Sequence, residues 1–325
     1  MALPTWPVVP PAAIGMLGGG QLGRYALIAA REMGYRTVVL DPDPLAPAGM
    51  VADVHLVAAY DDLDAIGQVA HRCSVATTEF ENPPASTLER LARYIPVAPA
   101  PEAVAIAQDR RREKRFLRDA GLPVAPFAVI DTEEDIKDAA AAIDFPALLK
   151  TATGGYDGKG QATVAALADL AGAWQALGGV PCVLEQRLEL DCEISSIIAR
   201  SWSGDIAAYA VAENQHVDGI LRVSMVPARV GVGVAEAAIH YANEIASRLE
   251  YVGVLAVELF VVDGQVVVNE LAPRPHNSGH WTLDASMSDQ FAQQVRAVCG
   301  LPLGSTSLTA PAAAMCNLLG DHWKN

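Results

Sequence analysis

The chain has 325 residues and a mass of 34.2 kDa, which at roughly 150 residues per domain predicts two or more domains. Hydrophobic residues make up 51% of the sequence and charged residues 19%, which excludes an intrinsically disordered chain. The 38 acidic and 23 basic side chains leave a net charge of −15, so the overall field repels nucleic-acid phosphates and anionic membrane surfaces. We therefore expect no nucleic-acid partner and no membrane partner.

The N-terminal part of the sequence predicts a βαβ unit. After a proline-rich segment that we expect to be loose, a buried strand runs into the glycine-rich residues 18–23, and a helix follows over residues 24–33 and ends at Gly34. Apolar runs predict the strands of a parallel sheet at 13–17, 37–40, 54–57 and 75–78. We expect this domain to close near the prolines at 96–101.

The rest of the chain predicts a different kind of domain. A helix is expected over residues 110–118, ending at Gly121 and Pro123. Strand-like runs then dominate, at 147–150, 182–185, 194–198, 254–261 and 266–269. This order of elements predicts an α+β domain with largely antiparallel strand pairing.

The five cysteines lie far apart and form no CxxC pair. That distribution argues against a disulfide framework or a structural zinc site and favours a reducing cytoplasm. The uncharged stretches 1–23 and 301–320 are interrupted by prolines and glycines. We expect neither a signal peptide nor a membrane-spanning helix in them.

The first glycine-rich loop contains Gly18, Gly20 and Gly23 in GxGxxG spacing, and Asp41 ends the next strand. In a dinucleotide-binding fold such a loop holds the pyrophosphate and the acid binds the ribose, so the pattern alone predicts a nicotinamide-dependent enzyme. The alternative is that the glycines only permit a tight turn and that Gln21 faces a substrate.

A second loop, residues 153–161, follows the predicted strand that ends in Lys150. Its glycines leave backbone N–H groups free to surround anionic oxygens, and Lys150 and Lys159 add positive charge, as in a phosphate-binding loop. The loop lacks the Walker spacing. A flexible hairpin turn is the alternative, but it does not explain the two lysines.

Glu258 and Glu270 flank a predicted hairpin whose turn contains Asp263 and Gly264. Two carboxylates on one face would suit Mg²⁺, which binds protein oxygens together with nucleotide phosphates. Since side chains alternate along a strand, a two-residue turn would place the two acids on opposite faces, and we predict a three-residue, bulged turn instead. The alternative is a pair of solvated acids.

Residues 270–280 gather Arg274, His276 and His280 beside this site. Arg274 suits an anion clamp, whereas zinc binding by the two histidines lacks a third ligand nearby. The basic run at 110–115 is typical of a solvated helix face rather than of nucleic-acid binding.

The motifs at 155–161 (GYDGKGQ), 269–274 (NELAPR) and 276–281 (HNSGHW) closely resemble those of the 5-(carboxyamino)imidazole ribonucleotide synthases, which are ATP-grasp ligases of purine biosynthesis. The resemblance runs from the loop at 18–24 to residues 318–320. It implies a Rossmann-like domain at 1–98, an ATP-grasp domain at 99–300 and the start of a small C-terminal domain at 301–325. The implied reaction converts bicarbonate to carboxyphosphate with ATP and transfers the carboxyl group to 5-aminoimidazole ribonucleotide.

The same resemblance implies roles for individual residues. Those that match nucleotide phosphate and base contacts are Arg110, Lys150, Gly155, Tyr156, Asp157, Gly158, Lys159, Gly160, Gln161 and His216. The adenine hinge matches Glu185, Gln186, Arg187 and Leu188, and the ribose acid matches Glu193. Glu258 and Glu270 match the Mg²⁺ ligands, with Asn269 beside them.

Arg274, His276 and Asn277 match the positions that hold bicarbonate or carboxyphosphate. The ribonucleotide pocket matches Tyr156 and Asp157, and its first-domain side matches Gln21 and the acids of the stretch 79–82, Glu79 and Glu81. The family also implies a homodimer. Its members continue into a basic stretch where this sequence stops, so we expect an incomplete C-terminal domain. The alternatives are an NAD-dependent oxidoreductase and a nucleotide-binding protein that is inactive without that stretch.

Overall fold

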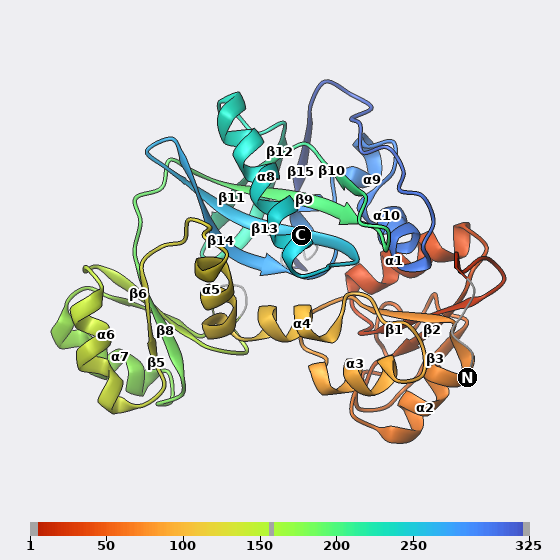
Figure 1. Ribbon diagram of the computed structural model, residues 1–325, viewed down its shortest axis with the longest axis horizontal. Helices are drawn as coiled ribbons and strands as arrows, with labels where there is room; N and C mark the ends of the chain where they lie inside the picture. Colours follow the sequence, from red (N-terminus) through yellow and green to blue (C-terminus); the bar gives the residue numbers. More distant parts are fainter. Residues whose placement is uncertain (1–5, 156–158, 321–325) are drawn as a thin grey trace.

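The computed structural model describes residues 6–155 and 159–320. Three parts are visible in Figure 1: a parallel-sheet domain that carries the N-terminus, a large antiparallel sheet in the centre, and a small lobe at the opposite end. In the described residues, none of the helices has the length and apolar character needed to span a bilayer. The predicted fold class, α/β followed by α+β, is confirmed.

The N-terminal domain is built on a four-stranded parallel sheet in the order β3-β2-β1-β4. Its strands are β1 (Ala13–Leu17), β2 (Arg36–Leu40), β3 (Val54–Leu56) and β4 (Val75–Thr78). The covering helices are α1 (Gln21–Glu32), α2 (Leu63–Arg72) and α3 (Ala85–Ala92). All four predicted strands and the helix that ends at Gly34, where φ is 87°, are confirmed.

The proline-rich segment is not loose where the structure describes it, so that prediction is wrong for residues 6–12. Val8 is buried, its N–H donates to the carbonyl of Cys299, and its own carbonyl accepts from the Tyr35 hydroxyl. Trp6 lies against Trp202, with ring centroids 4.9 Å apart. These partners lie far along the chain, so no local pattern announces the packing.

The central sheet has the order β14-β13-β9-β11-β12-β15, with β10 paired to β9, and all of its pairings are antiparallel. Its strands are β9 (Cys192–Arg200), β10 (Ile206–Ala208), β11 (Ala212–Val217), β12 (Ile220–Val226), β13 (Gly253–Val262), β14 (Gln265–Ala272) and β15 (Ala313–Cys316). Helix α8 (Val232–Arg248) packs on β9 and β13, and α10 (Gln290–Cys299) joins the sheet to α1. Short helical segments follow β14: η2 (Asn277–Gly279) and α9 (Thr282–Ala285).

The small lobe is a four-stranded antiparallel sheet in the order β5-β8-β6-β7, covered by two helices (Figure 1). Its elements are β5 (Phe127–Ile130), η1 (Glu133–Asp135), α6 (Ile136–Ala142), β6 (Ala147–Thr151), β7 (Gln161–Val164), α7 (Leu167–Ala176) and β8 (Cys182–Gln186). Helices α4 (Pro101–Gln108) and α5 (Arg110–Asp119) connect the N-terminal domain to this lobe. The predicted helix at 110–118 is confirmed, and Gly121 follows it with φ at 75°.

The β13–β14 hairpin corrects one prediction and confirms another. Val262 pairs with Gln265, so the turn has two residues, Asp263 and Gly264, both at positive φ, and the predicted three-residue turn is wrong. The extra residue lies within the ladder instead, where the register shifts between Glu258 and Leu259. This bulge places Glu258 directly opposite Glu270, on the same face as predicted.

Candidate active site

A cleft of about 570 Å³ lies between the small lobe and β13. It is lined by Ala125, Pro146, Leu148, Lys150, Glu185, Gln186, Arg187, Leu188, Glu189, Leu190 and Phe260. All four predicted hinge residues, 185–188, are among them. Apolar side chains form two opposing walls, from Leu148 on the lobe and Phe260 on the sheet, which suits a planar base.

Lys150 and Glu185 form an ion pair at the inner end of this cleft. The distance from Lys150 Nζ to Glu185 Oε1 is 3.2 Å, and the other carboxylate oxygen lies 3.0 Å from Lys114 Nζ. Burial lowers the pKa of Lys150, and the neighbouring carboxylate of Glu185 acts against that shift. Burial alone would raise the pKa of Glu185, but the ammonium groups of Lys114 and Lys150 lower it to about 2. The ion pair therefore holds the Lys150 side chain at the position predicted to meet phosphate.

The second glycine loop connects β6 and β7, with Lys150 paired to Gln161. The Thr151 N–H donates to the Gly160 carbonyl at 2.8 Å, and Gly160 has φ at 71°. Gly155 begins the loop beside the Arg110 guanidinium, because a Cβ added at Gly155 would lie 3.8 Å from Nη2 of Arg110. Lys159 is exposed, and the predicted residues Tyr156, Asp157 and Gly158 lie outside the described part of the chain.

The two predicted metal ligands lie together next to Arg110. Glu258 and Glu270 are cross-strand partners, and Arg110 Nη1 is 2.8 Å from Glu270 Oε2. The buried Asn269 Oδ1 has no hydrogen-bond partner among the described residues. Hard oxygen donors of this kind fit Mg²⁺, for which two carboxylates form only part of an octahedral shell and nucleotide phosphates supply further oxygens. Asn269 is the residue that the bulge inserts between the paired positions.

His276 belongs to this carboxylate pair rather than to a zinc site. Its Nε2 lies 3.1 Å from Glu258 Oε1. Burial would raise the pKa of Glu258, but the contact with His276 lowers this pKa to about 2. The His280 Nδ1 donates to the Asn277 carbonyl at 2.9 Å. In the described parts of the chain no group of three or more His, Cys, Asp or Glu residues could hold a metal, so the zinc alternative has no support there.

Two further predicted residues meet on neighbouring strands. Glu193 lies on β9 and His216 on β11, and His216 Nδ1 is 2.7 Å from Glu193 Oε2. The structure thus brings the predicted ribose acid and the predicted nucleotide-binding histidine together. Both belong to the same sheet that carries Glu258.

Arg274 connects the central sheet to the N-terminal domain. Its Nε donates to Glu81 Oε2 at 2.6 Å, and one Nη donates to the Pro275 carbonyl at 3.2 Å. Arg274 lowers the pKa of Glu81, although burial would raise it. Glu81 lies in the acidic stretch 79–82 that matches the first-domain side of the ribonucleotide pocket, and it is the residue that holds the predicted anion clamp.

The first glycine loop is filled by carboxylates of the protein itself. Glu79 accepts hydrogen bonds from the N–H groups of Gly20 and Gly23, and Asp41 accepts from Gly19 N–H and the Tyr60 hydroxyl, both at 2.7 Å. The amides and the acid that would bind a dinucleotide are therefore already engaged. This arrangement contradicts the dinucleotide interpretation and leaves Gln21, the exposed first residue of α1, beside the loop.

Sequence reasoning missed the inner face of α5. The sequence pattern predicts a solvated face for the basic run at 110–115, but Glu113 and Lys114 are both 0% exposed. The signal that could have revealed them is the spacing of residues 110, 113 and 114, which places all three on one side of a helix.

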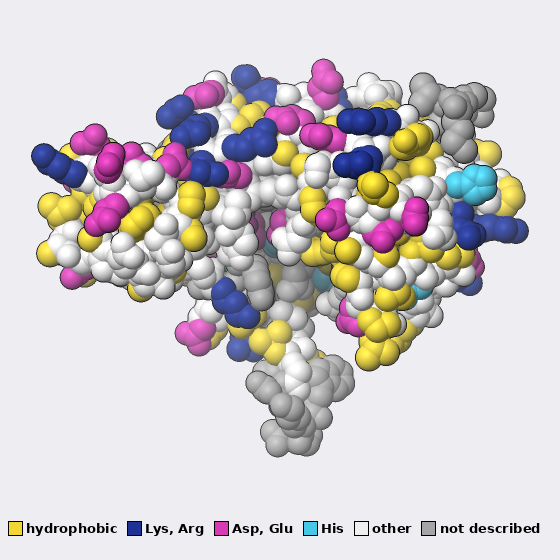
Figure 2. Space-filling view, turned by 90° about the horizontal axis from the view of Figure 1, so that it is seen from below, with side chains coloured by type: hydrophobic (Ala, Val, Ile, Leu, Met, Phe, Trp, Pro, Cys, Tyr) yellow, Lys and Arg dark blue, Asp and Glu magenta, His cyan; other side chains and the backbone are white. Residues whose placement is uncertain are grey.

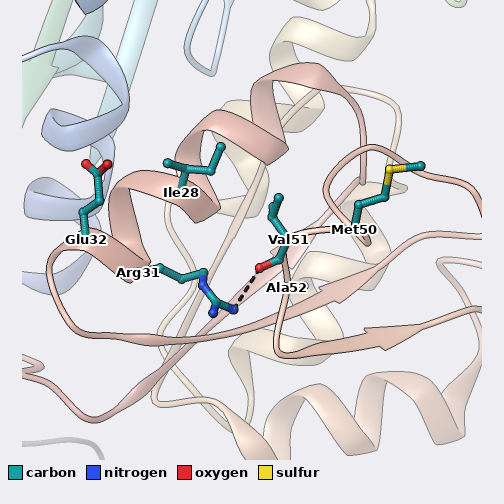
Figure 3. Close-up of a pocket in the computed structure, with 6 residues that line it drawn as sticks. All are labelled: Ile28, Arg31, Glu32, Met50, Val51 and Ala52. Atoms are coloured by element: carbon teal, nitrogen blue, oxygen red, sulfur yellow. Dashed lines mark hydrogen bonds between the residues drawn. The ribbon is translucent and has the colours of Figure 1, made fainter.

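A separate groove of about 650 Å³ lies on the N-terminal domain between α1 and residues 50–52 (Figure 3). Arg31 crosses it to donate to the Val51 carbonyl at 2.9 Å. No residue predicted for the active site lines this groove. On the face shown in Figure 2, basic and acidic side chains are intermixed rather than gathered into a basic patch.

Two family models match the chain. The ATP-grasp domain model matches residues 115–291, and the ribonucleotide synthetase preATP-grasp domain model matches residues 12–108. Together they cover the parallel sheet of the N-terminal domain, the small lobe and the central sheet apart from β15.

Curated relatives share much of the sequence. The chain is 44% identical over 318 residues to the N5-carboxyaminoimidazole ribonucleotide synthase of Bacillus subtilis, covering 98% of this chain and 83% of that protein. It is 45% identical over 315 residues to the enzyme of the same name from Brucella melitensis, covering 96% and 87%.

Solved structures agree. The ADP complex of an N5-carboxyaminoimidazole ribonucleotide synthetase superposes with a TM-score of 0.94 at 44% identity, covering 98% of this chain and 84% of that one. The Aspergillus clavatus enzyme in complex with ADP and 5-aminoimidazole ribonucleotide has a TM-score of 0.87 at 27% identity, covering 95% and 82%.

Proposed function

Because the chain belongs to the N5-carboxyaminoimidazole ribonucleotide synthases, a family of ATP-grasp ligases, we propose that it carboxylates 5-aminoimidazole ribonucleotide with bicarbonate at the expense of ATP. The products are N5-carboxyaminoimidazole ribonucleotide, ADP and phosphate. This is a step of purine biosynthesis.

ATP would occupy the cleft between the small lobe and β13. The apolar walls would hold adenine against residues 185–188, with Glu193 and His216 near the ribose. Lys150, Arg110 and the loop at 155–161 would neutralise the phosphates. The observation that supports this most directly is the 2.8 Å contact between Arg110 and Glu270, the residues proposed to bind phosphate and metal.

We assign Mg²⁺ to Glu258 and Glu270, with Asn269 beside them. When bound, the ion would neutralise charge on the transferring phosphoryl group. Arg110 and His276 hold the two carboxylates in place from either side.

Bicarbonate would bind at Arg274, His276 and Asn277. Its oxygen attacks the γ-phosphorus of ATP, the bond to ADP breaks, and carboxyphosphate forms. The amine of the ribonucleotide then attacks the carboxyl carbon, phosphate departs, and the amine loses a proton. The fixed guanidinium of Arg274, oriented by Glu81, stabilises the anionic species without reorganising during the reaction.

The ribonucleotide would lie between Tyr156 and Asp157 on one side and Gln21 and the Glu79 loop on the other. The relative solved with this ribonucleotide supports the class of substrate. We further propose domain boundaries at 98 and 300, a homodimer, and a cytoplasmic location, for which five free cysteines are the supporting observation.

The test is an assay with ATP, Mg²⁺, ¹³C-bicarbonate and the ribonucleotide, in which ADP and labelled product are both measured. We expect ¹³C in the product and a loss of product when any one component is omitted. Arg274→Gln should raise the KM for bicarbonate, whereas Arg248→Gln, which removes an exposed arginine on α8, should not. ADP formation that ignores bicarbonate, or product without label, would overturn the proposal.

A further inference from the structure

Helix α5 buries two ionisable side chains that the proposed reaction does not use. Glu113 and Lys114 are each 0% exposed, although removing a charge from water is unfavourable unless partners compensate. Their partners include the two peptide groups of β14 that flank Glu270, those of Asn269 and Leu271.

Lys114 holds the backbone on one side of Glu270. Its Nζ donates to the Asn269 carbonyl at 2.9 Å, and the same Nζ lies 3.0 Å from Glu185 Oε2. Glu185 is on β8 of the small lobe, whereas Asn269 is on the central sheet. One ammonium group therefore joins the wall of the nucleotide cleft to the strand of the proposed metal ligand.

Glu113 holds the backbone on the other side. The Leu271 N–H donates to its Oε1 at 2.6 Å. Arg110, one helical turn earlier on the same face, contacts the Glu270 side chain itself. Since β14 is an edge strand of the central sheet, its outward peptide groups have no strand to pair with, and α5 supplies their partners here.

We propose that Glu113 and Lys114 are positioning residues that fix the peptide groups flanking Glu270 and, through Lys114 and Glu185, tie the orientation of that carboxylate to the nucleotide-binding lobe. The inference rests on the proposed function, because it takes Glu270 as a metal ligand. The small bulge at Asn269 makes such a restraint necessary: a bulged edge strand has fewer ladder hydrogen bonds to hold Glu270 opposite Glu258.

The consequence is energetic coupling between metal and nucleotide. Coupling is measured as the ratio of two affinities, here the Kd for ADP without Mg²⁺ divided by the Kd with saturating Mg²⁺. If Glu270 is held correctly, Mg²⁺ strengthens ADP binding. If the peptide groups that flank Glu270 are released, the nucleotide contacts that do not involve the metal remain. The factor by which Mg²⁺ strengthens ADP binding then falls.

The experiment is titration calorimetry of ADP binding in EDTA and in Mg²⁺, with folding checked by circular dichroism and thermal melting. We expect Lys114→Met and Glu113→Ala each to lower the ratio about tenfold or more. Glu113→Gln keeps an oxygen for the Leu271 N–H and should stay within about threefold of the wild type. Arg115→Met, on the exposed side of the same helix, is the matched control and should leave the ratio unchanged.

Contrary results are distinguishable. A well-folded Lys114→Met or Glu113→Ala variant with the wild-type ratio overturns the positioning role, as does a Glu113→Gln variant that loses the coupling as fully as Glu113→Ala. If Lys114→Met does not fold, the comparison of Glu113→Ala with Glu113→Gln still decides. If wild-type ADP binding ignores Mg²⁺ altogether, the proposed metal site itself fails, whatever the variants do.

Discussion

Glu258 lies directly opposite Glu270 across the β13–β14 ladder, although the turn that joins the strands has only two residues. A regular ladder from that turn would pair Glu258 with residue 269 and send the Glu270 side chain to the other face. The bulge at Asn269 corrects the alternation by one residue. The proposed metal site therefore depends on a local irregularity of β14.

The first prediction concerns this carboxylate pair. Glu258→Gln should raise the Mg²⁺ concentration that gives half-maximal ADP formation by about tenfold or more, because a lost charge-assisted contact costs about 1.5–3 kcal/mol. Asp263→Asn removes the same charge at the tip of the same hairpin, and asparagine tolerates the positive φ there. A Mg²⁺ titration that gives equal midpoints for both variants would refute the assignment.

Most of the elements around this pair were predictable because they are locally encoded. The strands at 13–17, 75–78 and 147–150 are apolar runs bounded by turn residues, and helix α5 stops at a glycine with positive φ. The location of the bulge was not predictable, since it appears only in how β14 pairs with β13 across their hairpin. The burial of Lys114 was hidden because its partners lie far along the chain, on β8 and β14.

The site residues also divide into those that sequence motifs indicate and those that only the folded structure brings together. Motif resemblance predicted Lys150, Glu193 and His216, and the structure brings the last two to 2.7 Å from each other. Their roles in binding stay predictions. An acid in a loop, such as Glu81, gives no periodic signal in the sequence. Its ion pair appears only in the folded structure, where Arg274 reaches it from 193 residues away.

A second prediction concerns the lysine in the nucleotide cleft. Lys150→Met should raise the KM for ATP by roughly tenfold or more, because a charge-assisted phosphate contact of about 1.5–3 kcal/mol is lost. Lys137→Met, which changes an exposed lysine of the same lobe, is the control. Initial-rate measurements at varied ATP would contradict the phosphate role if the two variants had the same KM.

A third prediction concerns the thiols. Burial raises the pKa of Cys182 to about 11 and of Cys73 and Cys299 to about 12, so at pH 8 these groups are protonated and unreactive. Cys316 is exposed on β15, whereas Cys192 is half-buried and burial raises the pKa of its thiol as well. Reaction with a chromogenic disulfide should therefore show one fast thiol in the folded protein and five after unfolding. Cys316→Ser should abolish the fast phase; a fast phase that survives would mean that the half-buried Cys192 or one of the buried thiols is accessible.

The last prediction concerns the buried carboxyl of Glu113. Burial, with Glu270 adding to it, raises its pKa to about 8 from an ordinary 4.5. The folded state therefore binds this proton more tightly than the unfolded state, and its contribution to stability is complete below about pH 4.5 and is lost as pH rises towards 8.

Glutamine imitates the protonated acid at every pH. In metal-free buffer, denaturant unfolding of Glu113→Gln should match the wild type near pH 5. By pH 8 the difference should favour the variant by about 1–3 kcal/mol, the usual penalty of an uncompensated buried polar group. Glu134→Gln, at an exposed glutamate, should show no such trend. A difference between Glu113→Gln and the wild type that is constant from pH 5 to pH 8 would show that Glu113 is already ionised in the folded protein, compensated by Arg110 and Lys114.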